Sequence, residues 1–278
     1  MNWQADRLQK WNRLSEPLQS TRPDPPLRIL VLAAHPDDET IGASVLLSRF
    51  PQSSVAFATD GAPRDTRLWS QGVNSSREAY AETRRQEALQ ALVYARVRRQ
   101  GVFWLGGVDQ ESTFEISSLA KQFAKLIADL RPEIVITHAY EGGHPDHDSA
   151  AVIARIAISS TETLPLLAEM TSYHARDGRC VTGEFLNSDS SVEVCFELSN
   201  EDRDRKRRML DAHASQRLVL ENFPIDRERL RLAPDYDFSE PPHSGKVWYE
   251  CMGWPMTAAR WCELATSALA GLQEHSCR

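Results

Sequence analysis

Apolar runs of the kind found in buried strands alternate with helical stretches along the first half of the chain, and this alternation constrains the fold more than any other feature. A continuous apolar run covers Ile29 to Ala34, and Ile41 to Phe50 then repeats at helical period. The pattern continues with expected strands at Val55 to Thr59, Val102 to Leu105 and Ile134 to His138, and with expected helices at Ser76 to Val93 and Ile116 to Leu130. Strands that alternate with helices pair in parallel through right-handed crossovers. We therefore predict an α/β fold, a Rossmann-like sandwich with a mostly parallel sheet.

The two ends of the chain have weaker patterns. Near the start, Trp3, Leu8, Trp11, Leu14 and Leu18 recur at near-helical spacing, which predicts a helix, and a Pro-rich linker follows at residues 23–26. Beyond Leu164 we expect strands at Leu167 to His174 and Val192 to Leu198, a helix from about Asn200 to Ala214 capped by Ser199, and a closing helix whose apolar face holds Trp261, Leu264, Ala265, Ala268 and Leu269.

Composition excludes several classes of protein. A formal net charge of -7 makes a general nucleic-acid surface unexpected, because that affinity comes from clustered Lys and Arg. The 5 cysteines are an odd number without a C-x-x-C pair, which argues against a disulfide framework or a thiolate zinc site and favours a cytoplasmic location. We expect neither a signal peptide nor a membrane span. The sequence leaves the oligomeric state open, a homo-oligomer included.

Two related tetrapeptides follow predicted strands. His35-Pro36-Asp37-Asp38 comes after the first strand, and His144-Pro145-Asp146-His147 comes after the strand that ends at His138. In open α/β sheets, ligands bind in the crevice beyond the carboxyl ends of the strands. Proline disfavours helix in the residue before it and suits the first helical position, so His35 and His144 should precede helices whose first turns hold Asp38 and His147.

Three of these side chains form a candidate metal site. His35, Asp38 and His147 supply two imidazoles and one carboxylate with a coordination position left open, which is typical of catalytic zinc and also suits iron or another divalent ion. Helix capping is the alternative reading of the first tetrapeptide, but capping needs one acid and three follow His35-Pro36. A solvated polar loop is the alternative reading of the second. The occurrence of both at equivalent strand ends favours the metal.

Together, Ala34-His35-Pro36-Asp37-Asp38-Glu39 and His144-Pro145-Asp146-His147 resemble the PIG-L-like (LmbE-like) family of N-acetylglucosamine de-N-acetylases. The resemblance is extended by Thr59-Asp60-Gly61, Arg84-x-x-Glu87, Leu105-Gly106-Gly107 and His213-Ala214-Ser215-Gln216, so it covers about Arg28 to Gln216. It implies a deacetylase domain over residues 28–216, preceded by a helix and linker at 1–27 and followed by an extension at 217–278 that packs on the domain.

The resemblance also implies a role for each site residue. His35, Asp38 and His147 would bind zinc, Asp37 would be the general base, and His144, protonated, would stabilise the oxyanion. Arg84 and Asp109 would hold the sugar, although an exposed helical pair of Arg84 with Glu87 explains Arg84 equally well. Glu39 and Asp146 would support the ligands from behind. Either Asp37 or His144 could protonate the leaving amine.

The expected reaction is hydrolysis of an N-acetyl or other N-acyl group on an amino sugar or glycoconjugate, a small-molecule substrate. Two alternatives remain: an amidase acting on a thiol conjugate or another acylated amine, and a Rossmann-like protein that holds an ion without turnover. The absence of a G-x-G-x-x-G loop after the first strand argues against dinucleotide binding. For His138, His174 and His213 we expect structural roles, with His213 worth testing, and for Trp248, Tyr249 and Trp254 packing is favoured over a place at the substrate mouth.

Overall fold

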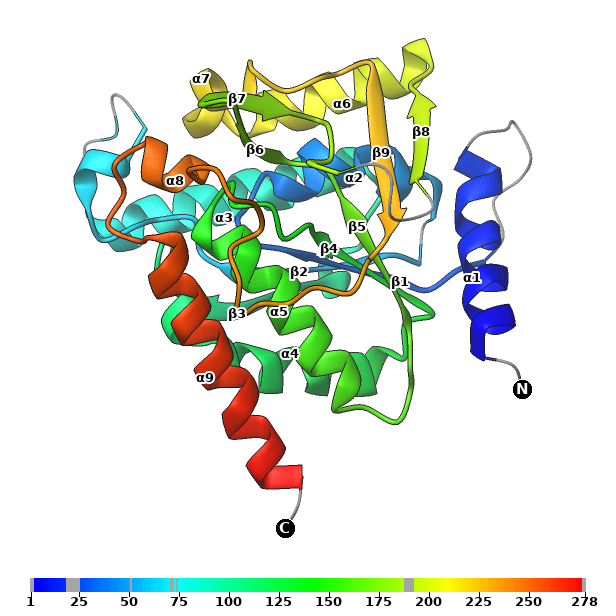
Figure 1. The fold of residues 1–278 in the computed structure, drawn as a ribbon. Helices are drawn as coiled ribbons and strands as arrows, with labels where there is room; N and C mark the ends of the chain where they lie inside the picture. Colours follow the sequence, from blue (N-terminus) through cyan, green and yellow to red (C-terminus); the bar gives the residue numbers. More distant parts are fainter. Residues whose placement is uncertain are drawn as a thin grey trace.

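The computed structural model describes residues 3–18, 26–50, 52–70, 73, 75–187 and 193–276. A seven-stranded sheet in the order β3-β2-β1-β4-β5-β9-β8 forms its centre (Figure 1). The strands of this sheet are β1 (Ile29–Ala33), β2 (Ser54–Thr59), β3 (Val102–Gly107), β4 (Ile134–His138), β5 (Leu166–Met170), β8 (Glu193–Glu197) and β9 (Arg227–Leu232). β1 to β5 pair in parallel, and β9 and β8 add antiparallel strands at one edge. The predicted α/β fold with a mostly parallel sheet is confirmed.

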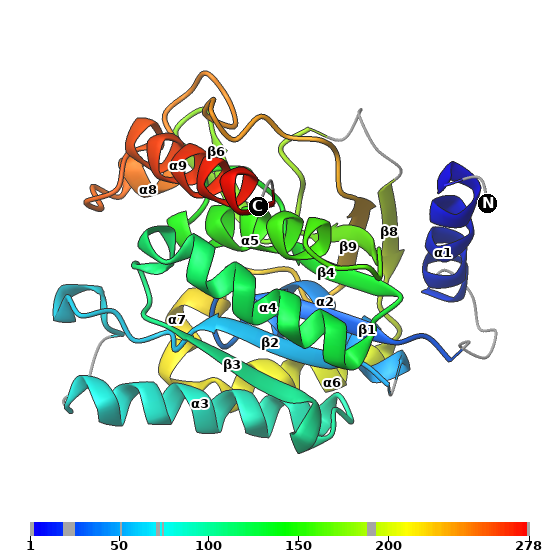
Figure 2. The same cartoon turned by 90° about the horizontal axis from the view of Figure 1, so that it is seen from below.

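Helices cover both faces of the sheet (Figure 2). On one face lie α2 (Asp38–Arg49), α3 (Arg77–Tyr94) and α6 (Asn200–Ala212), and on the other lie α4 (Ile116–Leu130), α5 (Pro145–Ser159) and α9 (Ala258–Ser276). Each face has its own apolar core, because alternate residues of the buried strands point to opposite sides: Ile29 and Val31 pack with the first set, Leu30 and Leu32 with the second. The N-terminal helix α1 (Trp3–Leu18) joins the first core through Trp11, Leu14 and Leu18.

The strand order places the two sequence motifs side by side. β1 pairs with β2 on one side and with β4 on the other, so the chain reverses its winding direction between β1 and β4. The carboxyl ends of these two neighbours carry the loops that contain His35 and His144. This arrangement forms the crevice that open α/β sheets offer to ligands.

The helix that follows β1 is kinked, and a buried carboxylate caps the second half. Ala43 departs from helical geometry with φ -142° and ψ 18°. The Glu228 carboxylate of β9 accepts the backbone N–H groups of Ser44 (3.1 Å) and Val45 (3.2 Å), which have no helical partner after the kink. Lys206 of α6 lies 3.0 Å from Glu228 and balances its charge. The site-bearing first turn of α2 is therefore fixed to β9 and α6.

Most predicted elements are confirmed, and the C-terminal half supplies the exceptions. The single strand predicted at Leu167 to His174 is wrong: β5 ends at Met170, and β6 (Tyr173–Arg176) leaves the main sheet to pair with β7 (Arg179–Thr182). β7 and β9 were not predicted. The helix capped by Ser199 is confirmed, since the Ser199 side chain accepts the Asp202 N–H. The linker at residues 23–26 lies outside the described residues except for its last position. None of the described helices is long and apolar enough to cross a membrane.

Candidate metal centre and active site

Asp38, the first residue of α2, lies between two histidines from separate loops. His147 Nε2 is 3.2 Å from Asp38 Oδ1, and His35 Nδ1 is 3.3 Å from Asp38 Oδ2. The His35 backbone N–H also donates to Oδ2 at 2.8 Å, which fixes the carboxylate against its own loop. Candidate ligand atoms of His35, Asp38 and His147 all lie within 4.8 Å of one another. The structure brings the three predicted ligand residues together.

The charges of Asp38 and His147 suit a divalent cation. Burial opposes protonation of His35, but the facing carboxylates of Asp109, Asp146 and Asp38 raise its pKa well above the usual value, so His35 must lose a proton to bind the ion. Burial opposes ionisation of Asp38, yet His147 and His138 beside it hold the pKa of its carboxyl well below the usual range. Burial lowers the pKa of His147 to about 4, so its imidazole is neutral and its lone pair is free for a ligand. His147 Nδ1 is buried and has no hydrogen-bond partner in the described chain. A buried carboxylate with two imidazoles is the donor set that zinc or ferrous iron accepts.

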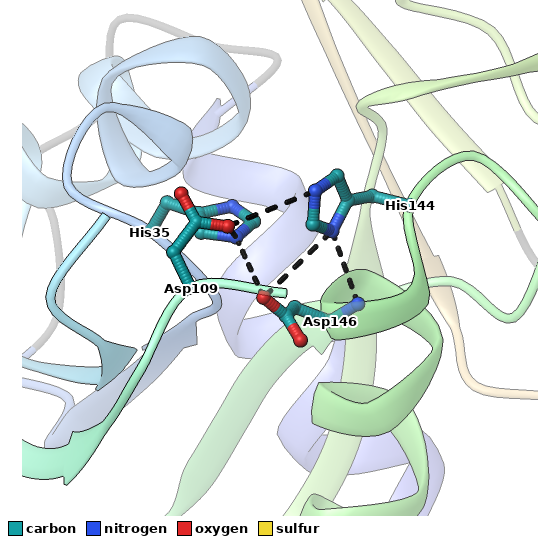
Figure 3. A group of neighbouring side chains, drawn as sticks. All are labelled: His35, Asp109, His144 and Asp146. Carbon is teal, nitrogen blue, oxygen red and sulfur yellow. Dashed lines mark hydrogen bonds and ion pairs between the residues drawn. The ribbon is translucent and has the colours of Figure 1, made fainter. Parts of the chain in front are cut away.

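A second cluster lies beside the first and includes the same histidine (Figure 3). It consists of His35, Asp109, His144 and Asp146, whose candidate ligand atoms also lie within 4.8 Å of one another. The carboxylate of Asp146 is already saturated: Oδ1 accepts the Ser112 hydroxyl at 2.5 Å, and Oδ2 accepts the Gln110 N–H at 2.6 Å and faces His35 Nε2 at 3.1 Å. Asp146 is therefore better suited to orient His35 than to bind an ion. The donor sets favour His35, Asp38 and His147 as the ligands.

Asp37 has the most unusual backbone of the site. It has φ 124° and ψ -29°, a region that side-chain-bearing residues rarely occupy and that costs about 1–3 kcal/mol of strain. Its carboxylate lines the cavity and accepts Arg84 Nη2 at 3.0 Å. Burial raises the pKa of Asp37 to about 7, with Arg84 opposing the rise. Such strain persists only where the surroundings enforce it, and it is typical of functional residues.

Arg84 holds the loop that contains Asp37 in place. The side chain comes from α3, is buried, and donates from Nη2 to the Pro36 carbonyl at 2.5 Å and from Nη1 to the Gly61 carbonyl at 2.8 Å. Gly61 has φ +64°, and a Cβ there would lie 2.9 Å from Pro36, so this turn requires glycine. Sequence reasoning placed Arg84 on the sugar or in an exposed pair with Glu87. The exposed pair is wrong, because Arg84 is buried and Glu87 instead accepts the Ser215 N–H and hydroxyl.

His144 caps α5 and faces the cavity with its other nitrogen. Nδ1 accepts the Asp146 N–H at 3.0 Å, which leaves Nε2 to carry the proton of a neutral ring. Nε2 lies 2.6 Å from the side-chain amide of Gln110, which must turn its oxygen toward that proton. Burial, followed by the charge on His35, lowers the pKa of His144 well below its ordinary value. A neutral ring with its proton on Nε2 can donate a hydrogen bond, whereas the protonated form expected from sequence stays a prediction. Trp254 packs edge-on against it, with centroids 4.8 Å apart.

Glu39 and His213 lie behind the candidate ligands, away from the cavity. Glu39 is buried; its Oε2 accepts the Asp37 N–H at 3.0 Å, and its Oε1 lies 3.4 Å from His213 Nε2. His213 therefore supports the loop and does not reach the cavity. His138 also lies close, with its ring stacked on His147 at 4.0 Å and its Nε2 3.3 Å from Asp38 Oδ2.

A cavity of ≈ 170 Å³ contains seven of the nine predicted site residues. His35, Asp37, Asp38, Arg84, Asp109, His144 and His147 line it, while Glu39 and Asp146 stand behind. Sequence reasoning missed Gln110, Tyr173, Val219 and Phe223, and it favoured packing for Trp254, which lines the cavity. Among these residues, Gln110 could have been predicted to lie at the site, because it follows Asp109 in the sequence. The others lie in segments with no motif.

The part of the chain that carries the candidate ligands is similar to known proteins. The family model PIG-L, described as GlcNAc-PI de-N-acetylase, matches residues 30–158. The 1D-myo-inositol 2-acetamido-2-deoxy-alpha-D-glucopyranoside deacetylase of Kineococcus radiotolerans is 28% identical over 156 residues, 45% of this chain and 43% of that protein. The probable N-acetyl-alpha-D-glucosaminyl L-malate deacetylase 2 of Bacillus subtilis is 29% identical over 143 residues, 49% and 64% of the two chains. The chain therefore spans about half the length of these relatives.

Solved structures share the fold at low sequence identity. A deacetylase of teicoplanin biosynthesis superposes with a TM-score of 0.57 at 16% identity, covering 73% of this chain and 96% of that one. The 4-carboxy-2-hydroxymuconate hydratase of Pseudomonas putida superposes with a TM-score of 0.52 at 15% identity, covering 76% and 98%. Because a deacetylase and a hydratase share this architecture, the reaction must be argued from the site.

Proposed function

We propose that this chain is a metal-dependent deacetylase that hydrolyses the N-acetyl group of an amino sugar or glycoconjugate, because residues 30–158 match the PIG-L family model. One observation supports this most: His35, Asp38 and His147 converge while the Asp37 carboxylate faces the same cavity without joining them. A metal site beside a carboxylate that is not one of the proposed ligands provides both an electrophile and a base, which a purely structural ion does not need.

His35, Asp38 and His147 would hold the cation, and zinc is our first choice with ferrous iron as the alternative. When bound, a divalent ion polarises a carbonyl and acidifies water, which overcomes the poor nucleophilicity of neutral water toward an amide. The hydrogen bonds of Arg84 and Glu39 hold the Asp37 loop, and thereby Asp37, in place for that water.

The remaining steps use the chain's own residues. Asp37 takes a proton from the attacking water as the water oxygen bonds to the acyl carbon. The resulting oxyanion accepts a hydrogen bond from His144 Nε2–H, an interaction often worth about 3 kcal/mol. Cleavage of the C–N bond releases the amine, which receives the proton from Asp37, and acetate remains.

Two substitutions separate the proposed roles. Asp37→Ala should keep stoichiometric metal and lose acetate release, because the ligands are intact and the base is gone. His147→Ala should lose the metal itself. Metal analysis and acetate release are measured on both purified variants, and normal turnover by either one would refute the mechanism. The substrate panel includes acylated amines without a sugar and a thiol-conjugate amide, so that the broader amidase reading is tested in the same assay.

A further inference from the structure

Part of the wall of the catalytic cavity is apolar. It is formed by Ile41, Leu68, Val219, Leu220, Phe223 and Trp254. Ile41, Leu220 and Phe223 form a small apolar cluster of their own, separate from the two cores of the sheet. Leu68 comes from the loop after β2, Val219 and Leu220 from α7 (Arg217–Leu220), and Trp254 from the turn after α8 (Trp248–Cys251). In Figure 1, α7 and α8 lie at the end of the sheet that the loop after β2 also reaches.

No Arg or Lys among the described lining residues is available for an anionic substrate. Among the described residues that line the cavity, Arg84 is the one Arg or Lys, and its Nη groups are bound to Pro36, Asp37 and Gly61. Three arginines in the neighbouring segment are each paired with an acid: Arg64 with Glu111, Arg67 with Asp65 and Arg77 with Asp60. A phosphate or carboxylate on the substrate would therefore enter without a counter-charge from the wall.

The apolar wall continues outward to solvent at Val219. Its exposed fraction is 53%, although it lines the cavity, whereas its neighbour Leu218 is 61% exposed and does not line it. The cavity holds ≈ 170 Å³, below the roughly 300–1,000 Å³ of sites that enclose a whole small-molecule ligand. A glycoconjugate must therefore extend beyond the cavity to its outer edge, where it would cover Val219.

Building on the proposed function, we propose that the substrate is a neutral N-acylated amino sugar carrying an apolar group, which lies on the rim formed by Leu68, Val219, Phe223 and Trp254. Val219, Phe223 and Trp254 lie outside residues 30–158, so this preference belongs to the part of the chain that the family model does not match. The apolar group could be the aglycone or the acyl chain. Both would present an apolar surface to the rim, and the test below distinguishes the aglycone from the acyl chain.

The test compares four substrates by kcat/KM on the metal-loaded protein, below micelle-forming concentrations. They are the methyl and hexyl glycosides of N-acetylglucosamine, the methyl glycoside of N-hexanoylglucosamine, and N-acetylglucosamine 1-phosphate. Either the hexyl glycoside or the hexanoyl amide should exceed the methyl acetyl compound at least about 10-fold, since each methylene buried in an apolar site contributes to discrimination. The phosphate should be the poorest substrate. Equal values for all neutral compounds, or preference for the phosphate, would overturn the inference.

A matched pair of variants locates the effect. Val219→Asp should lower the ratio of kcat/KM for the hexyl glycoside to that for the methyl glycoside, or for the hexanoyl amide to that for the acetyl amide, at least about fivefold. The reason is that a carboxylate replaces an apolar contact. Leu218→Asp puts the same charge one residue away, off the cavity, and should keep the ratio. The same ratio in both variants would contradict the assignment of the rim.

Binding to Asp37→Ala, measured by calorimetry, distinguishes failure of this inference from failure of the proposed function. At least about tenfold tighter binding of one apolar ligand than of the methyl compound, without turnover by the native chain, would keep the inference and refute the deacetylase. Turnover of all substrates without selectivity would refute this inference and keep the proposed deacetylase.

Discussion

At the scale of the residue, Arg84 shows most clearly how sequence and structure differ. The resemblance assigns it to the sugar, but its hydrogen bonds hold the strained Asp37 loop. Arg84→Lys keeps the charge and loses the planar fork that reaches three acceptors. We expect kcat to fall roughly 10- to 100-fold, as for other residues that orient a catalytic group, with KM changed less than about threefold.

Steady-state kinetics on metal-loaded protein check this prediction. Arg85→Lys is the control, because Arg85 is the exposed neighbour on the same helix and packs over Trp104, away from the site. A large rise in KM with unchanged kcat would instead support the sugar-binding role.

His144 offers a second prediction, which also decides between the two ligand clusters. Removal of an oxyanion donor costs about 10²–10³ in kcat, so His144→Ala should lose this much activity and keep its metal. Elemental analysis of the purified variant is the deciding measurement. Loss of the ion together with activity would show that the cluster of His35, Asp109, His144 and Asp146 holds it.

The sequence could predict those residues whose neighbours in the chain fix their geometry. The His-Pro pair at each strand end predicted that the histidine precedes its helix and that Asp38 and His147 lie in the first turns. In the structure, α2 begins at Asp38 and α5 at Pro145. Asp146 could be placed near the site but its partners could not, because Gln110 and Ser112 reach it from the loop after β3. Contacts between distant segments leave no local pattern.

At the scale of the element, β4 and α4 have the predicted bounds, whereas β9 was missed. The sequence Arg-Glu-Arg-Leu-Arg-Leu in β9 resembles an exposed segment, yet Glu228 and Arg231 are both buried. Arg231 lies 2.8 Å from Glu169 of β5, and Glu228 caps the second half of α2. Charged residues at buried positions are stable only with such partners, which the local sequence does not reveal.

The cap formed by Glu228 leads to a prediction about stability. Glu228→Ala leaves two backbone N–H groups of α2 without their acceptor and leaves the buried ammonium of Lys206 with the Ile41 carbonyl but no opposite charge. This should lower the free energy of unfolding by about 3–5 kcal/mol. Glu197→Ala on adjacent β8 removes an exposed carboxylate and should change it by less than about 0.5 kcal/mol. Urea denaturation measures both, and equal stabilities would refute the capping role.

At the scale of the whole molecule, the site joins parts of the chain that the sequence links only through topology. The neighbouring positions of β1 and β4 bring His35 to His147. The two related motifs at strand ends predicted that these loops meet, but the sequence did not predict the strand order. The apolar wall is different, because α7 and the turn after α8 reach the crevice by routes that no periodic pattern encodes. The catalytic groups were therefore more predictable than the surface that would select the substrate.

Because the proposed ligands come from two distant loops, the ion should stabilise the folded chain as a whole. A ligand at 100 times its dissociation constant that binds only the folded state adds about 2.7 kcal/mol to the free energy of unfolding. For a domain of this size, that corresponds to a rise in Tm of about 5–10 °C. Thermal unfolding with Zn²⁺, with Fe²⁺ under anaerobic conditions, and with a chelator would show which ion has the larger effect.

His147→Ala identifies the source of that stabilisation. With one of three ligands removed, the rise in Tm should largely disappear, whereas Asp37→Ala should keep it because Asp37 is not assigned to the ion. Histidines and cysteines in the unfolded chain also bind zinc and reduce the net effect, so the native and variant chains must be compared at equal ion concentration. An undiminished rise in His147→Ala would place the stabilising ion elsewhere on the protein and separate it from the cavity that contains Asp37.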